Sequence, residues 1–311
     1  MCSLSVMAII VSYQPDLASL RGLLEALRPQ VALSVVVDNG SDEDVAGWIA
    51  ANVRDNLHCL ALGANYGVAA AQNAGVRYAR EAGATHVILF DQDSEPAPDM
   101  VAHLVAACLH MESLGYKVAA VGPRYIDSRQ NNPPPFIQIR GFRLHRQECR
   151  NTGDVVRVDY LVSSGCLIPM TALEAVGMMR EELFIDYVDI EWGLRSRSMG
   201  FQSFGACDAI MEHQLGEAPI RFMGKMLPVH TPLRHYYHFR NAVWMYRQNW
   251  PPFNWKVRDA HRLLLKFVFY TFMARPRWQH LKMITLGVLH GLRGRMGVFP
   301  TDSAEADNGS R

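Results

Sequence analysis

Residues 1–122 alternate short apolar runs, rich in β-branched side chains, with longer stretches in which apolar residues recur at helical spacing. This alternation predicts βαβ units with right-handed crossovers around a mostly parallel sheet. We expect strands at 4–12, 33–38, 57–62, 86–91 and 118–122. We expect crossover helices at about 16–28, 42–53, 67–82 and 98–114.

The pattern becomes less regular after Gly122. A run of Asn and Pro at 131–135 interrupts regular structure. We expect antiparallel strands at 136–146 and 155–162, and helices at 171–176, 189–199 and within about 235–294. The polar segment 301–311 has no large apolar residue, which predicts disorder. The resulting division is an α/β domain at 1–230, a basic amphipathic helical region at 231–300 and a tail at 301–311.

The composition of the 311 residues, 49% hydrophobic and 20% charged, is that of a globular protein and excludes disorder, collagen and coiled coil. The net charge of +1 conceals a strong asymmetry. Residues 1–220 contain 16 Lys and Arg against 26 Asp and Glu, whereas 221–300 contain 14 against 1. Such a basic segment indicates a phosphate-bearing partner, either nucleic acid or anionic lipid.

The six cysteines are far apart and form no Cys-x-x-Cys pair, which favours reduced thiols in a cytosolic protein. The apolar N-terminal stretch has no basic residue before it and no small-residue cleavage site after it, so we expect no signal peptide. No window reaches about 18 uninterrupted apolar residues, so we expect no transmembrane helix.

Ligands of open parallel sheets bind beyond the carboxyl ends of the strands, which makes polar residues at these ends the first candidates. The run HVILFDQDSE places Asp91 and Asp93 there. Two such carboxylates suit Mg²⁺ or Mn²⁺, whose shell is completed by water and substrate phosphates, and so imply a diphosphate substrate. A simple polar turn is the alternative. An aspartyl-phosphate phosphatase is disfavoured because its Thr or Val is replaced by Glu95.

Two further strand ends carry candidate ligand groups. Ser12 and Tyr13 follow the first strand, and Asp38 follows the second, where a carboxylate can accept hydrogen bonds from a nucleobase or a ribose. A type I′ turn at Asn-Gly is the alternative for Asp38. After the third strand, NYGVAAAQNAG leaves room for a ligand at Gly67 and Asn73, although an Ala-rich packing helix explains the same residues.

A third acidic group occurs in FIDYVDIEWGLRSRS, where Asp186, Asp189 and Glu191 begin a predicted helix. Acids in a first turn stabilise the helix dipole without any catalytic role. Three carboxylates exceed what capping requires, so one of them is a candidate general base for a hydroxyl nucleophile.

The motifs together resemble those of family 2 glycosyltransferases of the GT-A fold, most closely the bacterial rhamnosyltransferase branch. The resemblance runs from Ala8 to about Asn249, in the order of the family. It rests on AIIVSYQPD, VVVDNGSDE, NYGVAAAQNAG, ILFDQDS, SSGCLIP, FIDYVDIEWGLRSRSMG, the His of IMEHQLGE, and YYHFRNAVWMYRQN.

The resemblance implies a role for each matching residue. The nucleotide-sugar-binding residues would be Ser12, Tyr13, Asp38, Asn65, Gly67, Asn73, Asp91, Gln92, Gly165 and Arg240. Tyr13 and Asp38 would lie at the nucleobase, Asn65, Gly67 and Asn73 on the ribose and diphosphate side, and Arg240 over the phosphates. The metal ligands would be Asp91, Asp93 and His213. Asp189 aligns with the general base; because Val188 replaces the Glu that usually precedes it, Asp186 and Glu191 remain alternatives.

The activity implied by this resemblance is inverting, metal-dependent transfer of L-rhamnose from dTDP-L-rhamnose to a lipid-linked saccharide in surface polysaccharide (O-antigen-type) synthesis. UDP-galactofuranose and UDP-glucose are alternative donors. A peripheral membrane protein with a degenerate transferase domain is the non-enzymatic alternative. Sugar-phosphate nucleotidyltransferases are disfavoured because their Gly-rich loop after the first strand is missing.

The basic helical region mixes Trp, Phe and Leu with Lys, Arg and His at helical spacing, as interfacial helices on anionic membranes do. We therefore expect a cytoplasmic protein held peripherally on the inner face of the cytoplasmic membrane. Ordinary packing helices with solvated cations are the alternative. No recognition motif supports nucleic-acid binding.

Overall fold

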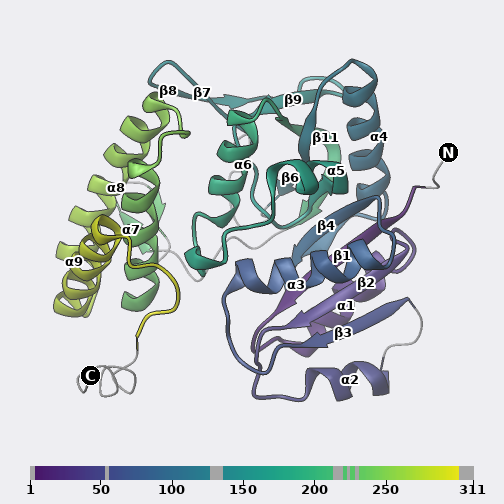
Figure 1. Ribbon diagram of the computed structural model, residues 1–311, viewed down its shortest axis with the longest axis horizontal. Coiled ribbons are helices and arrows are strands. Elements are labelled where there is room, and N and C mark those ends of the chain that lie inside the picture. Colours follow the sequence, from purple (N-terminus) through teal and green to yellow (C-terminus); the bar gives the residue numbers. More distant parts are fainter. Residues whose placement is uncertain are drawn as a thin grey trace.

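The computed structural model describes residues 4–52, 56–126, 136–212, 220–222, 225–227 and 231–300. A central sheet and its covering helices lie on one side of the molecule, and three C-terminal helices lie on the other (Figure 1). His213 and the segment 301–311, about which the sequence makes predictions, lie outside the described residues.

The central sheet has the strand order β3-β2-β1-β4-β10-β6-β11-β5, and β9 also pairs with β11. Its strands are β1 (Val6–Ser12), β2 (Leu33–Asp38), β3 (Leu57–Ala61), β4 (His86–Asp91), β5 (Glu95–Pro96), β6 (Val118–Ile126), β9 (Val155–Val158), β10 (Cys166–Pro169) and β11 (Gln202–Glu212). The neighbours from β3 to β4 are parallel, whereas β10 runs antiparallel between β4 and β6. The five predicted parallel strands are confirmed, and β2 and β4 match residue for residue.

Two small antiparallel sheets complete the strands. They are β7 (Phe136–Arg140) with β8 (Arg143–Gln147), and β12 (Ile220–Phe222) with β13 (Lys225–Leu227). The single strand predicted at 136–146 is therefore wrong: the chain reverses at Gly141, whose φ is +56°, and forms a hairpin.

Helices cover both faces of the sheet. On one face lie α1 (Leu17–Leu27), α2 (Val45–Asn52) and α4 (Met100–Ser113), and on the other lie α3 (Val68–Glu81), α5 (Met170–Val176) and α6 (Val188–Ser198). Successive strand residues supply the two cores: Ala8 and Ile10 of β1 face the first layer, and Ile9 faces the second. A strand that is apolar on both faces is the pattern of a covered parallel sheet.

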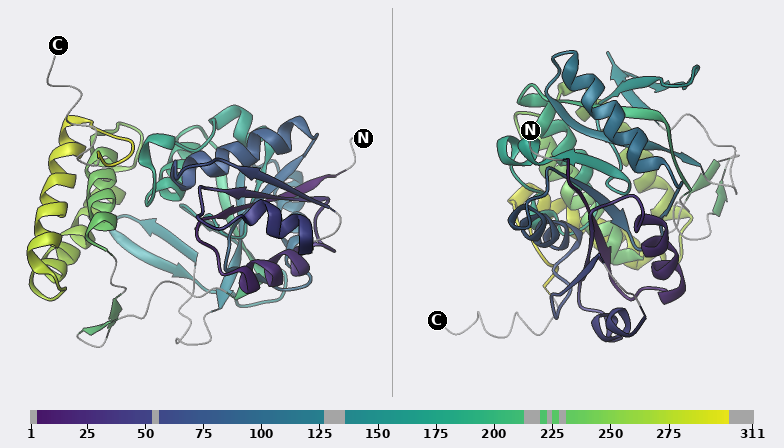
Figure 2. Two further views of the ribbon diagram at one scale, coloured as in Figure 1. Left: turned by 90° about the horizontal axis from the view of Figure 1, so that it is seen from below. Right: turned by 90° about the vertical axis from the view of Figure 1, so that its right-hand side faces the viewer.

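The C-terminal region forms three helices, α7 (Pro232–Arg247), α8 (Phe253–Phe272) and α9 (Arg277–Arg293). Helix α9 packs closely on α7, because a Cβ atom at Gly291 would lie 2.5 Å from the carbonyl oxygen of Arg240. The β7–β8 hairpin extends from the α/β part to these helices (Figure 2), and Asn254 of α8 donates to the carbonyl of Gly141 at 2.7 Å. The helical prediction for this region is confirmed.

The expectation that all the cysteines are reduced is wrong for one pair, because Cys149 and Cys207 form a disulfide. They are 58 residues apart in sequence and meet because β9 pairs with β11 beside them. Cys59, Cys108 and Cys166 carry free thiols. Within the described ranges, no helix is long and apolar enough to cross a lipid bilayer.

Candidate active site

Three polar residues lie at the carboxyl ends of adjacent parallel strands. Ser12 on β1 is paired in register with Asp38 on β2, and Asp91 on β4 is paired with Val11 of β1. In open α/β sheets this edge borders the ligand-binding crevice. The prediction that Ser12, Asp38 and Asp91 share one rim is confirmed.

Asp38 is held in place by the turn that follows it. Its Oδ1 accepts a hydrogen bond from the Ser41 hydroxyl at 2.5 Å, and the Ser41 amide lies 3.3 Å from both carboxylate oxygens. Only Gly40 has a positive φ here, so the turn is not type I′, which requires two such residues. Because Oδ2 accepts less than Oδ1, it retains capacity for a ligand N–H or O–H.

The loops after β1 and β4 are joined by Gln92, whose Oε1 accepts from the Tyr13 amide at 2.8 Å. The Tyr13 ring is 46% exposed. Its position beside the rim leaves an aromatic face on which a nucleobase can stack.

The turn before β10 supports the end of β4. The Ser164 hydroxyl accepts from the Asp91 amide at 3.2 Å and lies 2.6 Å from the Ser94 hydroxyl. Gly165 has φ +69°, and its amide donates to the Leu89 carbonyl at 2.6 Å. No role is predicted for Ser94 or Ser164 from the sequence, because the β4–β10 pairing brings them together.

Gly67 lets the chain approach itself closely, and the predicted approach of a ligand to this residue stays a prediction. A Cβ atom at this position would lie 2.5 Å from the carbonyl oxygen of Phe184, and Val68 donates to that oxygen at 2.8 Å. Asn65 shapes the same loop, since its Oδ1 accepts from the Gly67 amide at 3.0 Å and from Asn39 at 3.1 Å. The start of α3 is thereby fixed to the FIDYVD segment.

The predicted contact of Asn73 with ribose or diphosphate is wrong. This side chain is buried in the inner face of α3. Its Nδ2 donates to the Met179 carbonyl and to Glu181, both at 2.9 Å, and its Oδ1 accepts from the Met179 amide at 3.0 Å. Both ends of the amide are used within the protein.

Asp189 lies in the first turn of α6, where its Oδ1 accepts from the Ile190 amide at 2.8 Å. Burial raises the pKa of Asp189 from 3.8 to about 6, and the nearby carboxylates of Asp186 and Asp91 contribute to the rise. A carboxylate that is still ionised at neutral pH, yet more basic than usual, has the properties of a general base.

Asp189 also borders a small cavity together with Trp192 and Gln72. The Oε1 of Gln72 is buried and has no hydrogen-bond partner among the described residues. Gln72 is not among the residues predicted for the site. Its only signal was a polar side chain within an Ala-rich helix.

The segment before Asp189 is strained, because Phe184, Asp186 and Tyr187 all have φ between 62° and 66°. Such a conformation costs a non-glycine residue about 1–3 kcal/mol. Asn241 of α7 opposes this cost: its Nδ2 lies 2.8–2.9 Å from three backbone carbonyl oxygens of the segment, the last being that of Asp186.

Arg240, predicted to cover the diphosphate, has no exposed surface. Its guanidinium donates to the carbonyls of Glu182 at 3.1 Å, Leu183 at 3.0 Å and Gly297. The predicted phosphate contact is therefore wrong, and Arg240 joins the C-terminal region to the segment that carries Asp189.

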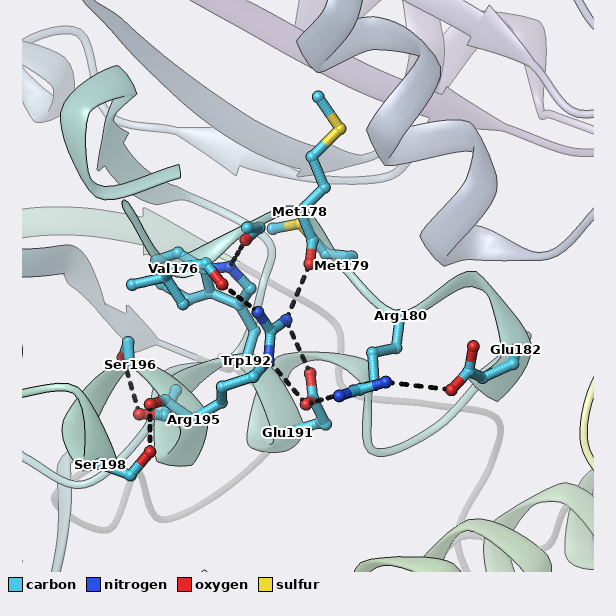
Figure 3. Close-up of polar contacts among 12 residues, drawn as sticks. Val176, Met178, Met179, Arg180, Glu182, Glu191, Trp192, Arg195, Ser196 and Ser198 are labelled. Atoms are coloured by element: carbon cyan, nitrogen blue, oxygen red, sulfur yellow. Dashed lines mark hydrogen bonds and ion pairs between the residues drawn. The ribbon is translucent and has the colours of Figure 1, made fainter. Parts of the chain in front are cut away.

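Glu191 is excluded as a catalytic base because it is fully buried in an ion-pair network (Figure 3). Its carboxylate lies 2.8 Å from Nε of Arg195 and 3.0 Å from Nε of Arg180. Arg195 also donates to the backbone carbonyls of Val176 and Met178. The network fixes α6, and with it Asp189, against the segment after α5.

The residues present at the end of β4 are suited to a hard divalent cation. Asp91 is partly buried and Asp93 is exposed. Two carboxylates leave most of the coordination shell to water and phosphate oxygens, which is what Mg²⁺ and Mn²⁺ require. Among the residues whose structure is described, no group of three or more metal-binding side chains occurs. The third predicted ligand, His213, lies outside them.

A family model described as glycosyl transferase family 2 matches residues 7–166, half of the chain. The chain belongs to glycosyl transferase family 2. It is 33% identical over 94% of its length, and over 97% of the relative, to dTDP-rhamnosyl transferase RfbF of Shigella flexneri. It is 24% identical over 65% of its length, and 64% of the relative, to the low-salt glycan biosynthesis hexosyltransferase Agl10 of Haloferax volcanii.

Solved structures of other proteins share the fold of this family 2 transferase. TarS 1–349 of S. aureus in complex with UDP-GlcNAc has a TM-score of 0.59 at 13% identity, with 94% of this chain and 82% of that chain covered. GalNAc-T7 with UDP, GalNAc and Mn²⁺ has a TM-score of 0.61 at 13% identity, with 93% and 56% covered. In another structure of S. aureus TarS, the match covers 88% of this chain and 44% of that chain. The predicted α/β, GT-A type of fold is confirmed.

Proposed function

We propose that this family 2 transferase moves L-rhamnose from dTDP-L-rhamnose to a hydroxyl group of a lipid-linked saccharide, with inversion, in surface polysaccharide (O-antigen-type) synthesis. The identity of 33% over nearly the whole chain with a dTDP-rhamnosyl transferase supports the choice of donor. The observation that carries the mechanism is the position of Asp189, a base of raised pKa that interacts electrostatically with Asp91 at the sheet rim.

Residues of the rim bind the donor in this mechanism. Asp38 accepts a hydrogen bond from the nucleobase or ribose, and Tyr13 stacks on the base. Asp91 and Asp93 would hold Mg²⁺ or Mn²⁺, an ion that neutralises negative charge on a diphosphate when it is bound. The segment fixed by Asn241 and Arg240 keeps Asp189 in position during the reaction.

Asp189 acts on the acceptor. It takes the proton of the acceptor hydroxyl while that oxygen attacks the anomeric carbon from the face opposite the leaving dTDP. The C1–oxygen bond to the diphosphate breaks as the new glycosidic bond forms. A single displacement of this kind inverts the anomeric configuration.

Donor choice is tested by thermal unfolding of the wild-type protein with dTDP, UDP or GDP, each with and without Mn²⁺. Bound ligand stabilises the folded state by mass action. We expect dTDP with Mn²⁺ to raise the melting temperature most, and Asp93→Ala to abolish both the effect of Mn²⁺ and rhamnosyl transfer. A larger shift with UDP would assign another donor. Full transfer activity in EDTA would exclude the metal.

The acceptor side of the proposal is supported by the outer surface of α8. Its exposed apolar residues lie within an arc of roughly 120° on the helix, and Trp278, 81% exposed, follows at the start of α9. These residues are Phe253, Val257, Leu264, Leu265, Val268 and Phe272. We call them the α8 stripe.

Charge favours an anionic bilayer as the partner of the α8 stripe. Residues 231–300 contain 12 Lys and Arg against one acid, Asp259. Asp259 accepts hydrogen bonds from the hydroxyls of Tyr187 and Tyr246, each at 2.7 Å. A second copy of this chain would bring like charge against like charge, whereas anionic lipid neutralises it. We propose that the protein lies on the inner face of the cytoplasmic membrane.

Sedimentation with liposomes tests this location. Leu265→Ser with Phe272→Ser should reduce binding to anionic vesicles at least about tenfold, because each half-exposed apolar side chain contributes about 1 kcal/mol when it enters lipid. Leu109→Ser is the control, because Leu109 is comparably exposed but lies on α4. Equal binding to neutral and anionic vesicles, or dimer formation that the double variant abolishes, would contradict the membrane assignment.

A further inference from the structure

A group of basic side chains from α7 and α8 surrounds Asp186, three residues before Asp189. Nη2 of Arg234 lies 3.4 Å from Oδ1 of Asp186, and Nδ1 of His238 lies 3.9 Å from Oδ2. Nζ of Lys266 lies 2.9 Å from Nε2 of His238. We call Arg234, His238 and Lys266 the basic cluster.

Asp186 contacts the basic cluster directly, and Asp259, which accepts from two tyrosine hydroxyls, is a second carboxylate that interacts electrostatically with Lys266. Burial lowers the pKa of Lys266, and the nearby Arg262 and Arg234 lower it further, whereas Asp186 and Asp259 raise it; with Arg262 included, three cations meet two carboxylates here. Nε of Arg234 is buried and has no hydrogen-bond partner in the described part of the chain. An anion placed against the exposed part of the Arg234 side chain, which is 42% exposed, would relieve the repulsion.

The position of the basic cluster indicates which anion it binds. Asp189 interacts electrostatically with Asp91 at the sheet rim and also with Asp186, the carboxylate that the basic cluster contacts. The cluster therefore lies on the side of Asp189 that faces α7 and α8. Lys266 projects from one side of α8, and Leu264, Leu265 and Val268 of the α8 stripe project from the other. An anionic group here lies within one helix diameter, about 10 Å, of the surface proposed to meet lipid.

We propose that the basic cluster binds the phosphate through which the acceptor saccharide is attached to its lipid. This proposal rests on the proposed function, because it assigns the acceptor side of the same site. Arg234 and Lys266 donate to the phosphate oxygens in the manner of charge-assisted pairs. Phosphate binding would fix the first sugar of the acceptor at a set distance from Asp189, so that only a hydroxyl at that distance reaches the base.

The experiment measures binding of geranyl phosphate by titration calorimetry, with the donor site saturated by dTDP and Mg²⁺. We expect Arg234→Gln with Lys266→Gln to weaken binding at least about tenfold, the factor lost with one charge-assisted hydrogen bond. Arg234→Lys with Lys266→Arg, which preserves the charges, should retain most of the affinity. Lys282→Gln is the matched control, since Lys282 is an exposed cation on α9 outside the cluster.

Wild-type affinity in the Gln double variant would overturn the proposal, as would binding that disappears when dTDP fills the donor site. Inorganic phosphate serves as the second probe, and equal affinity for it would assign the cluster to free phosphate rather than to lipid. Loss of binding in both double variants would show a structural role only. The proposed function is judged separately, by stabilisation with dTDP, which does not involve the cluster.

Discussion

Replacing Asp189 by Asn should make the protein more stable and nearly inactive. The pKa of Asp189 is raised from 3.8 to about 6 by burial, so ionising this carboxyl disfavours the folded state. At 1.36 kcal/mol for each pKa unit this amounts to about 3 kcal/mol, and to about 2 kcal/mol after allowing for the partial exposure of the side chain. Asn cannot ionise, yet its oxygen can still accept from the Ile190 amide.

The effect of Asp189→Asn on stability depends on pH, because the pKa of Asp189 is higher in the folded protein than in the unfolded chain. Because the folded pKa is the higher one, the wild-type protein loses stability as pH rises from about 4 to about 6, and the Asn variant does not. The two proteins should be equally stable below about pH 4. The variant should be about 2 kcal/mol more stable above about pH 7.

Urea unfolding at pH 4 and pH 7.5 measures the difference in stability. A rhamnosyl-transfer assay measures turnover, and titration calorimetry measures the affinity for dTDP. We expect turnover to fall about 10²- to 10⁴-fold, as for loss of a general base, while dTDP affinity stays unchanged. Glu174→Gln, which changes an exposed carboxylate on α5, should alter neither quantity. A variant of Asp189 that is less stable than wild type at pH 7.5, or fully active, would refute the assignment.

Two substitutions test the residues that hold the segment before Asp189 in place, and a pH profile tests Asp189 itself. Asn241→Ala removes four hydrogen bonds, three to backbone carbonyls and one from Nε of Arg240, and should cost about 2–4 kcal/mol in urea unfolding and lower kcat more than dTDP affinity. Gly67→Ala should lower the melting temperature more than Gly63→Ala, because both have positive φ but only Gly67 contacts the carbonyl of Phe184; equal effects would contradict that contact. The pH dependence of kcat/KM should show activity falling as pH drops through about 6, and a midpoint near 4 would exclude a buried base.

Local pattern alone determined the first half of the fold. A run such as HVILFD is apolar on both faces and β-branched, so it forms a covered parallel strand wherever it lies. Its final Asp91 is then at the carboxyl end of the strand. Because such ends of adjacent strands share one edge, the sequence sufficed to place Ser12, Asp38 and Asp91 together.

The family motifs found the acidic helix start but not the task of each residue in it. Asp189, Glu191 and Asp186 are two to five residues apart, and all are plausible bases by residue type. The difference between them is burial and partners, which come from distant segments. Glu191 meets Arg180, Asp186 meets Arg234, and Asp189 accepts from the Ile190 amide.

Only the tertiary structure decided the roles of the C-terminal helices. The sequence predicts Arg240 over the phosphates and no role for Asn241, but α9 packs on α7, and both side chains bind the backbone before Asp189. The pairing of Cys149 with Cys207 was hidden for the same reason. Periodicity records which side of an element is apolar, whereas the partner of a polar group depends on where segments far apart in the chain come to lie.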